Sequence, residues 1–93
     1  MTVNFLIPGQ LTSMTAGRSH VKVEISSERL GDALEALFAV HPAIRDRILT
    51  EQAEIRQHVN VFVGQKEART TSGLATRLAD GTDVSIIPAI SGG

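Results

Sequence analysis

The chain of 93 residues has the length of one small domain with a single hydrophobic core, and 42% of its residues are hydrophobic. Ten acidic residues outnumber nine basic ones to give a net charge of −1, and all three aromatic residues are Phe. This balance argues against a nucleic-acid-binding protein. Cysteine is absent from the sequence, which excludes disulfides, thiolate nucleophiles and cysteine-ligated metal sites.

The N-terminus has neither the charged segment nor the apolar run of a signal peptide, and no apolar run reaches membrane-spanning length. We therefore expect a soluble, cytoplasmic protein that binds neither membrane nor nucleic acid.

An antiparallel pair of strands is predicted at the start of the chain. Apolar residues occupy every second position at 3, 5 and 7 and again at 21, 23 and 25, as in strands that turn one face to the core. The polar segment 10–19 between them predicts a turn, longer than the two-residue ideal.

A helix is predicted next, because the apolar period changes from two to about 3.6. Ser26 and Ser27 are candidates for its N-cap, and Pro42 ends it close to residue 40. A further short helical piece is expected over 44–48, where two isoleucines repeat at helical spacing.

The second half predicts a third strand over 55–63, a short edge strand over 66–69 and a last strand over 84–87. Between the last two, Leu74 and Leu78 are spaced for one or two helical turns. The expected fold is an α+β roll, a mixed sheet of four to five strands around one main helix, which is the β-grasp of ubiquitin-like proteins. We expect this domain over residues 1–88 and a flexible tail over 89–93.

Self-contained catalysis is not expected from these residues. His20, His41 and His58 are far apart in sequence and have no second ligand at metal spacing. The sequence also contains no GxSxG nucleophile motif and no phosphate-binding glycine loop. We predict no catalytic residue, no metal site and no bound cofactor.

The end of the chain is the one segment that combines access with chemistry. Pro88 discourages further sheet pairing, and the last two residues are glycines. The residues from Pro88 to Gly93 can extend roughly 20 Å. A terminal carboxylate must be activated before it accepts sulfur or an amine, for example as an acyl-adenylate formed with ATP and Mg²⁺. The chain has no site for these, so a separate activating enzyme is implied. Terminal glycines can also be merely tolerated, so the tail alone decides nothing.

The chain resembles the MoaD/ThiS family of ubiquitin-like sulfur carriers. The segments that carry this resemblance are VNVFV at 59–63, GLAT at 73–76, ADGTDVSIIPA at 79–89 and the final Gly92-Gly93. Within the family the chain is most similar to the carriers that serve cysteine biosynthesis. It departs from the family pattern in 10–19, which lacks the basic residue and paired glycines often seen there.

The resemblance implies a carrier, not an enzyme. An E1-like adenylyltransferase/sulfurtransferase would adenylate Gly93 and convert it to a thiocarboxylate, with Ser91 and Gly92 as the slender tail. A PLP-dependent cysteine synthase would use this sulfur, and a JAMM-type zinc metalloprotease would free the cysteine. The alternatives are a protein modifier that forms isopeptide bonds through Gly93, the small subunit of molybdopterin synthase, a thiamine-pathway sulfur carrier, and a plain binding module.

Strand alternation predicts where a partner binds. If the alternate apolar residues of each strand point inward, then Leu6, Phe62 and Ile87 point outward from neighbouring strands. Together with Pro88 they would form an apolar patch next to the tail, of the kind that marks a contact site. Each could instead be exposed singly or covered by 10–19.

Overall fold

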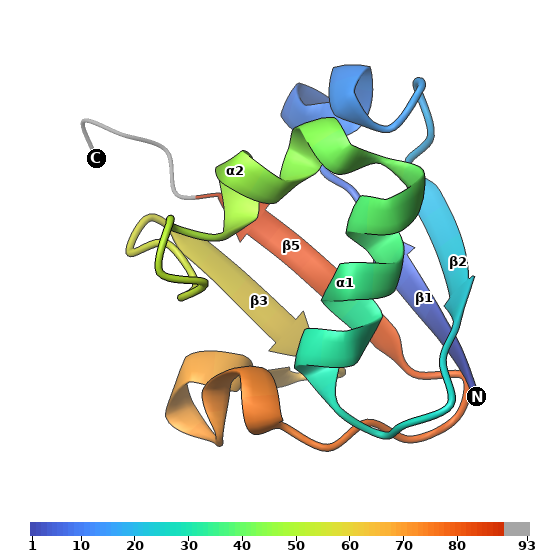
Figure 1. The fold of residues 1–93 in the computed structure, drawn as a ribbon, viewed down its shortest axis with the longest axis vertical. Coiled ribbons are helices and arrows are strands. Elements are labelled where there is room, and N and C mark those ends of the chain that lie inside the picture. The colour runs from blue at the N-terminus through green and yellow to red at the C-terminus, as the bar shows by residue number, and fades with distance from the viewer. Residues whose placement is uncertain (89–93) are drawn as a thin grey trace.

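The computed structural model describes residues 1–88, which form a five-stranded sheet with the helix α1 lying across one face (Figure 1). The predicted tail, residues 89–93, lies outside the described residues. The helices and strands are β1 (Thr2–Leu6), β2 (His20–Glu24), α1 (Leu30–Val40), α2 (Arg45–Ile48), β3 (Val59–Val63), β4 (Lys66–Glu67) and β5 (Asp83–Pro88). Short 3-10 helices occupy Gly9–Met14, Pro42–Ile44, Ala68–Thr70 and Gly73–Ala75.

The strands follow the order β2-β1-β5-β3-β4 across the sheet. β1 pairs antiparallel with β2 and parallel with β5, because α1 lies on the crossover between the two halves of the chain. β3 pairs antiparallel with β5 on one side and with β4 on the other. This arrangement is the β-grasp, which confirms the predicted α+β fold and its mixed sheet around one main helix.

The core lies between α1 and the sheet, and strand alternation sets which residues enter it. Val3 and Phe5 of β1, and Val84 and Ile86 of β5, are almost completely buried. On the facing helix the buried residues repeat at helical spacing, as the sequence predicted: Leu30, Ala33, Leu34, Leu37 and Phe38.

The helix α1 begins later than predicted. Its N-cap is Arg29, whose side chain makes no capping bond, and not Ser26 or Ser27. The delay has a long-range cause: Leu30 N–H donates to the Thr76 carbonyl at 2.9 Å, and Arg29 lies in an isolated antiparallel bridge with Arg77. This pairing holds Arg29 in an extended conformation, with φ −102° and ψ 138°, so tertiary pairing overrides the local capping signal.

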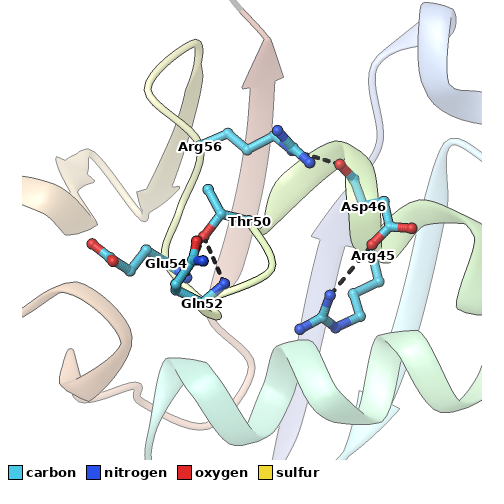
Figure 2. A network of polar contacts seen from close by, with 6 residues as sticks. All are labelled: Arg45, Asp46, Thr50, Gln52, Glu54 and Arg56. Atoms are coloured by element: carbon cyan, nitrogen blue, oxygen red, sulfur yellow. Dashed lines mark hydrogen bonds and ion pairs between the residues drawn. The ribbon is translucent and has the colours of Figure 1, made fainter.

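The third strand also begins later than predicted, at Val59 and not at residue 55. Ile55 instead forms an isolated bridge with Leu49, closing a loop between α2 and β3. Figure 2 shows how polar contacts hold this loop: Thr50 Oγ1 accepts the backbone N–H groups of Gln52 and Glu54, both at 3.2 Å. Arg56 Nε donates to the Asp46 carbonyl at 2.6 Å, which joins the end of the loop to α2.

The connections after β1 and after β4 contain 3-10 helices that the sequence did not predict, and the edge strand and the helical piece around Leu74 are shorter than predicted. The predicted turn over 10–19 contains most of a 3-10 helix, Gly9–Met14, whose Leu11 enters the core. The edge strand ends at Glu67, two residues early, and is followed by a 3-10 helix. Leu74 lies on a single 3-10 turn, and Leu78 is buried outside any helix, directly after the bridge residue Arg77.

The helices of residues 1–88 are short: α1, the longest, has 11 residues. None of them has the length and apolar character needed to cross a bilayer.

Candidate functional site

The face of the sheet opposite α1 carries the predicted apolar residues. The register aligns Leu6 of β1, Ser85 of β5 and Phe62 of β3 in one row across three adjacent strands. Ile87 stands two residues further along β5, on the same side as Ser85, and faces Asn60 of β3. The structure therefore brings Leu6, Phe62 and Ile87 together around Ser85, and we call these four residues the outer patch.

Alternation along each strand explains why these side chains point outward. Val59 and Val61 are buried, whereas Phe62 is half-buried and outside the core cluster. Ile86 is 1% exposed and its neighbour Ile87 is 47% exposed. The strand parity predicted from the sequence is confirmed, and Ile87 stays about half exposed. Binding of a partner to the outer patch stays a prediction.

The outer face is polar at one end of β5 and apolar at the other. Asp83, at the start of the strand, is in register with Asn4, which faces Lys22 of β2. Asn4 Nδ2 donates to Asp83 Oδ1 and to the Gly81 carbonyl, both at 3.3 Å. The apolar rows follow toward Pro88, so they lie at the end of β5 from which the chain continues to residue 93.

β5 is a fixed base for that continuation, because it is paired on both sides. Val59 of β3 lies opposite Pro88, and Phe5 of β1 opposite Val84. The turn before β5 is tied to β1 as well: Gly81 N–H donates to the Thr2 carbonyl, and Thr2 N–H donates to Asp80 Oδ1, both at 2.7 Å. The position of half-buried Pro88 is thus set by the sheet. Ser91, Gly92 and Gly93 lie outside the described residues.

Metal-ligating side chains do not gather into a candidate site anywhere within residues 1–88. No three His, Asp or Glu side chains of this part of the chain are placed to hold a metal ion. His20 lies on β2, His41 is the C-cap residue of α1, and His58 precedes β3.

Two arginines serve the fold. Arg69 donates from one terminal nitrogen to the carbonyls of Arg56 and Val59, at 2.8 and 3.0 Å, and so fastens the segment before β3. Arg77, which also forms the isolated β-bridge with Arg29, makes an ion pair with Glu28 at 2.7 Å.

Ser85, the polar centre of the outer patch, was not predicted to belong to it. The signal was present in its alternation with Val84 and Ile86, which are both buried.

Comparison with known proteins identifies the family. The ThiS family model matches residues 5–93 of the chain. The chain belongs to the ThiS family. Among curated ThiS-like relatives, it is 34% identical over 95 residues to the sulfur carrier protein CysO of Mycobacterium tuberculosis, with 100% of both chains covered.

A second relative is small archaeal modifier protein 1 of Haloferax volcanii, 33% identical over 79 residues, which cover 84% of this chain and 86% of that protein. Among solved structures, the Amycolatopsis orientalis BexX/CysO complex contains a chain that superposes with a TM-score of 0.88 at 26% identity, covering 98% of this chain and 99% of that one.

Proposed function

We propose that this ThiS-family chain is a sulfur carrier that holds its cargo on the α-carboxylate of Gly93. The observation that carries the proposal is its full-length likeness to the sulfur carrier protein CysO, at 34% identity. The chain itself acts as a co-substrate and not as an enzyme. It works in the cytoplasm, where ATP for its activation is available.

The reaction begins with the Gly93 carboxylate, which is a poor acyl donor because its oxygen is a poor leaving group. An E1-like adenylyltransferase binds ATP and Mg²⁺ and directs a carboxylate oxygen to the α-phosphorus, and pyrophosphate leaves. A sulfide-level sulfur donor then attacks the acyl carbon of the adenylate, and AMP leaves. The product is a thiocarboxylate with sulfur in place of one oxygen.

The two glycines suit this chemistry because they keep the backbone next to the reacting carbon free of side chains. A narrow channel on the activating enzyme can then admit the bare main chain. The domain supplies the other half of the recognition through the outer patch and Pro88, which bind the enzyme while Ser91, Gly92 and Gly93 enter the channel. An exposed apolar group such as Ile87, rimmed by polar residues, is typical of such contacts.

The sulfur is used for cysteine synthesis in this proposal. The thiocarboxylate sulfur attacks the β-carbon of an activated serine derivative on a PLP-dependent synthase, and the serine leaving group departs. The new cysteine is joined to the Gly93 carbonyl through its sulfur, as a thioester, and its own amine then displaces the sulfur from the carbonyl to leave an amide bond. A JAMM-type zinc metalloprotease hydrolyses this bond, which frees cysteine and regenerates the carboxylate with an oxygen from water.

A second candidate is a protein modifier, favoured by the 33% identity to small archaeal modifier protein 1. Here the same adenylate reacts with a lysine amine of a target protein, and Gly93 forms an isopeptide bond. The two functions differ in their products: a modifier gives a ladder of covalent conjugates in cell extract, whereas a carrier gives one free chain that contains the sulfur.

Reconstitution with the E1-like enzyme, ATP, Mg²⁺ and sulfide tests the proposal. We expect the wild-type chain to gain the mass difference between sulfur and oxygen. Variants with Gly93→Ala or with Gly93 deleted should stay unmodified while they keep the circular dichroism spectrum of the wild type. Serine at position 91 offers a matched control, because Ser91→Ala removes a hydroxyl without adding bulk to the tail and should be converted normally. Normal conversion of Gly93→Ala would refute the channel argument.

A further inference from the structure

A second candidate binding surface lies at the far side of the sheet from β3, along the open edge of β2. The sheet has two edge strands: β4 has two residues and β2 has five. Within residues 1–88 β2 pairs with β1 alone, so one side of this strand is open. Such an edge is a ready template for an additional strand.

The hydrogen bonds to β1 show which backbone groups face the open side. Ser19, just before β2, accepts the N–H of Ile7 at 2.8 Å, and Ile25, just after it, donates to Met1 at 2.9 Å. In an antiparallel pair these bonded positions alternate with unbonded ones, so the even-numbered residues point the other way. The N–H and C=O groups of His20, Lys22 and Glu24 are therefore free to pair with a new strand.

A groove of about 640 Å³ accompanies this edge where β2 passes the C-terminal end of α1. It is lined by Arg18, His20, Val21, Lys22, Val40 and His41, none of them a carboxylate. Val40 is 62% exposed, more than any other large hydrophobic side chain in the described part of the chain. Arg18 and Lys22 form none of the ion pairs found within residues 1–88.

We propose that the edge of β2 binds an extended acidic segment of a partner protein as a sixth strand of the sheet. Successive side chains of an added strand point to opposite faces. Those on the outer face that lie beside exposed His20 and Lys22 favour Glu or Asp, whereas exposed Glu24, on the same face at the end of β2, favours a neutral residue beside it. Those on the helix side would lie toward Val40, which favours apolar, β-branched residues. The segment thus alternates acidic and β-branched residues.

A second copy of this chain fits the same edge poorly. Antiparallel pairing of two β2 strands about their middle residue would place Lys22 opposite Lys22, and like charges directly opposite destabilise a strand pair.

The proposed strand would lie three strand spacings from β5, or roughly 14 Å. It would therefore leave Ile87 and Pro88 accessible, and the chain could bind this partner and an activating enzyme at the same time. The inference does not depend on the proposed sulfur chemistry.

A peptide titration of the full chain, labelled with ¹⁵N, tests this surface. The probe is a capped peptide of sequence Thr-Glu-Val-Asp-Val-Glu-Thr, and the control carries N-methyl groups on the amides that would pair with β2. We expect saturable shifts of backbone amides in residues 18–24 and at His41, and none with the methylated peptide. Lys22→Glu should weaken binding about tenfold, since it turns attraction into repulsion.

Lys66→Glu is the matched variant, because Lys66 is an exposed lysine on β4, at the opposite edge. It should bind the peptide as the wild type does. Lys22→Ala should lose less affinity than Lys22→Glu. Because it introduces no carboxylate, it shows whether the loss comes from the missing positive charge and not from a structural effect of the new side chain. The proposal is overturned if the amides of β2 do not shift or if the methylated peptide binds as tightly as the probe. It is also overturned if Lys22→Glu and Lys66→Glu lose the same affinity, or if the shifts centre on Phe62 and Ile87.

Discussion

Two adjacent isoleucines on β5 provide a direct test of the outer patch. Ile86 and Ile87 are the same residue type in the same strand, but Ile86 is 1% exposed and Ile87 is 47% exposed. Replacing each by alanine removes the same atoms from opposite faces of the sheet. We expect Ile86→Ala to reduce the stability of the fold, and Ile87→Ala to reduce activation by the E1-like enzyme.

The magnitudes follow from burial. Truncating a fully buried isoleucine to alanine costs about 2 to 5 kcal/mol, because it removes apolar contacts and leaves a cavity. A domain of 93 residues has a free energy of unfolding of about 5 to 14 kcal/mol, so Ile86→Ala removes a large share of it. Burying an isoleucine completely is worth about 1.5 to 3 kcal/mol relative to exposure. Because Ile87 is 47% exposed and so only about half covered, Ile87→Ala should cost about 0.8 to 1.5 kcal/mol.

Urea unfolding followed by circular dichroism measures the two stabilities, and ATP–pyrophosphate exchange on the E1-like enzyme measures activation. An interface side chain at the centre of a contact is worth about 1 to 2 kcal/mol, so Ile87→Ala should lower kcat/KM roughly 5- to 30-fold. Equal destabilisation by the two variants would contradict the assignment of faces. Unchanged kcat/KM in folded Ile87→Ala would contradict the role of the outer patch.

Two further predictions concern stability, each measured by urea unfolding. Gly81 has a φ of +79° with no atom within 4 Å of an added Cβ, so Gly81→Ala should cost about 1 to 2 kcal/mol through backbone strain alone. Gly9→Ala, equally open but without a positive φ, should change stability by less than about 0.5 kcal/mol; equal effects would refute the strain argument. Buried Thr76 donates from Oγ1 to the Gly73 carbonyl at 2.6 Å, so Thr76→Val should cost about 1 to 3 kcal/mol, and a neutral result would show that this bond is dispensable.

Strand alternation allowed much of the fold and of the outer patch to be predicted from the sequence. Side chains of a strand alternate between two faces, so only two assignments of residues to faces are possible. The apolar residues at positions such as Val61 and Ile86, which are buried, decide between the two in their strands. Once this assignment is known, Phe62 and Ile87 can only point outward. That these two strands are neighbours followed from the order of elements, which the β-grasp connects in few ways.

Element boundaries were predicted less well, because contacts distant in sequence decide them. Ser27 is a good local capping residue, yet its hydroxyl donates to Asp32 Oδ2 at 2.6 Å and the helix starts only after Arg29. The deciding contact is the hydrogen bond from Leu30 to Thr76, which lies 46 residues further along the chain. The local sequence around the helix therefore does not contain the residue that sets its start. The open edge of β2 was missed for a related reason: which strands lie at the edges is a property of the whole sheet.

The intact mass of the chain purified from its own cells tests the central claim most directly. We predict a fraction of chains heavier than the free acid by the difference between one sulfur and one oxygen atom, with fragmentation placing that difference on Gly93. This fraction should disappear when the E1-like enzyme is deleted. Only free acid under every growth condition, or Gly93 found solely in isopeptide bonds to lysine, would contradict the account of the chain as a sulfur carrier.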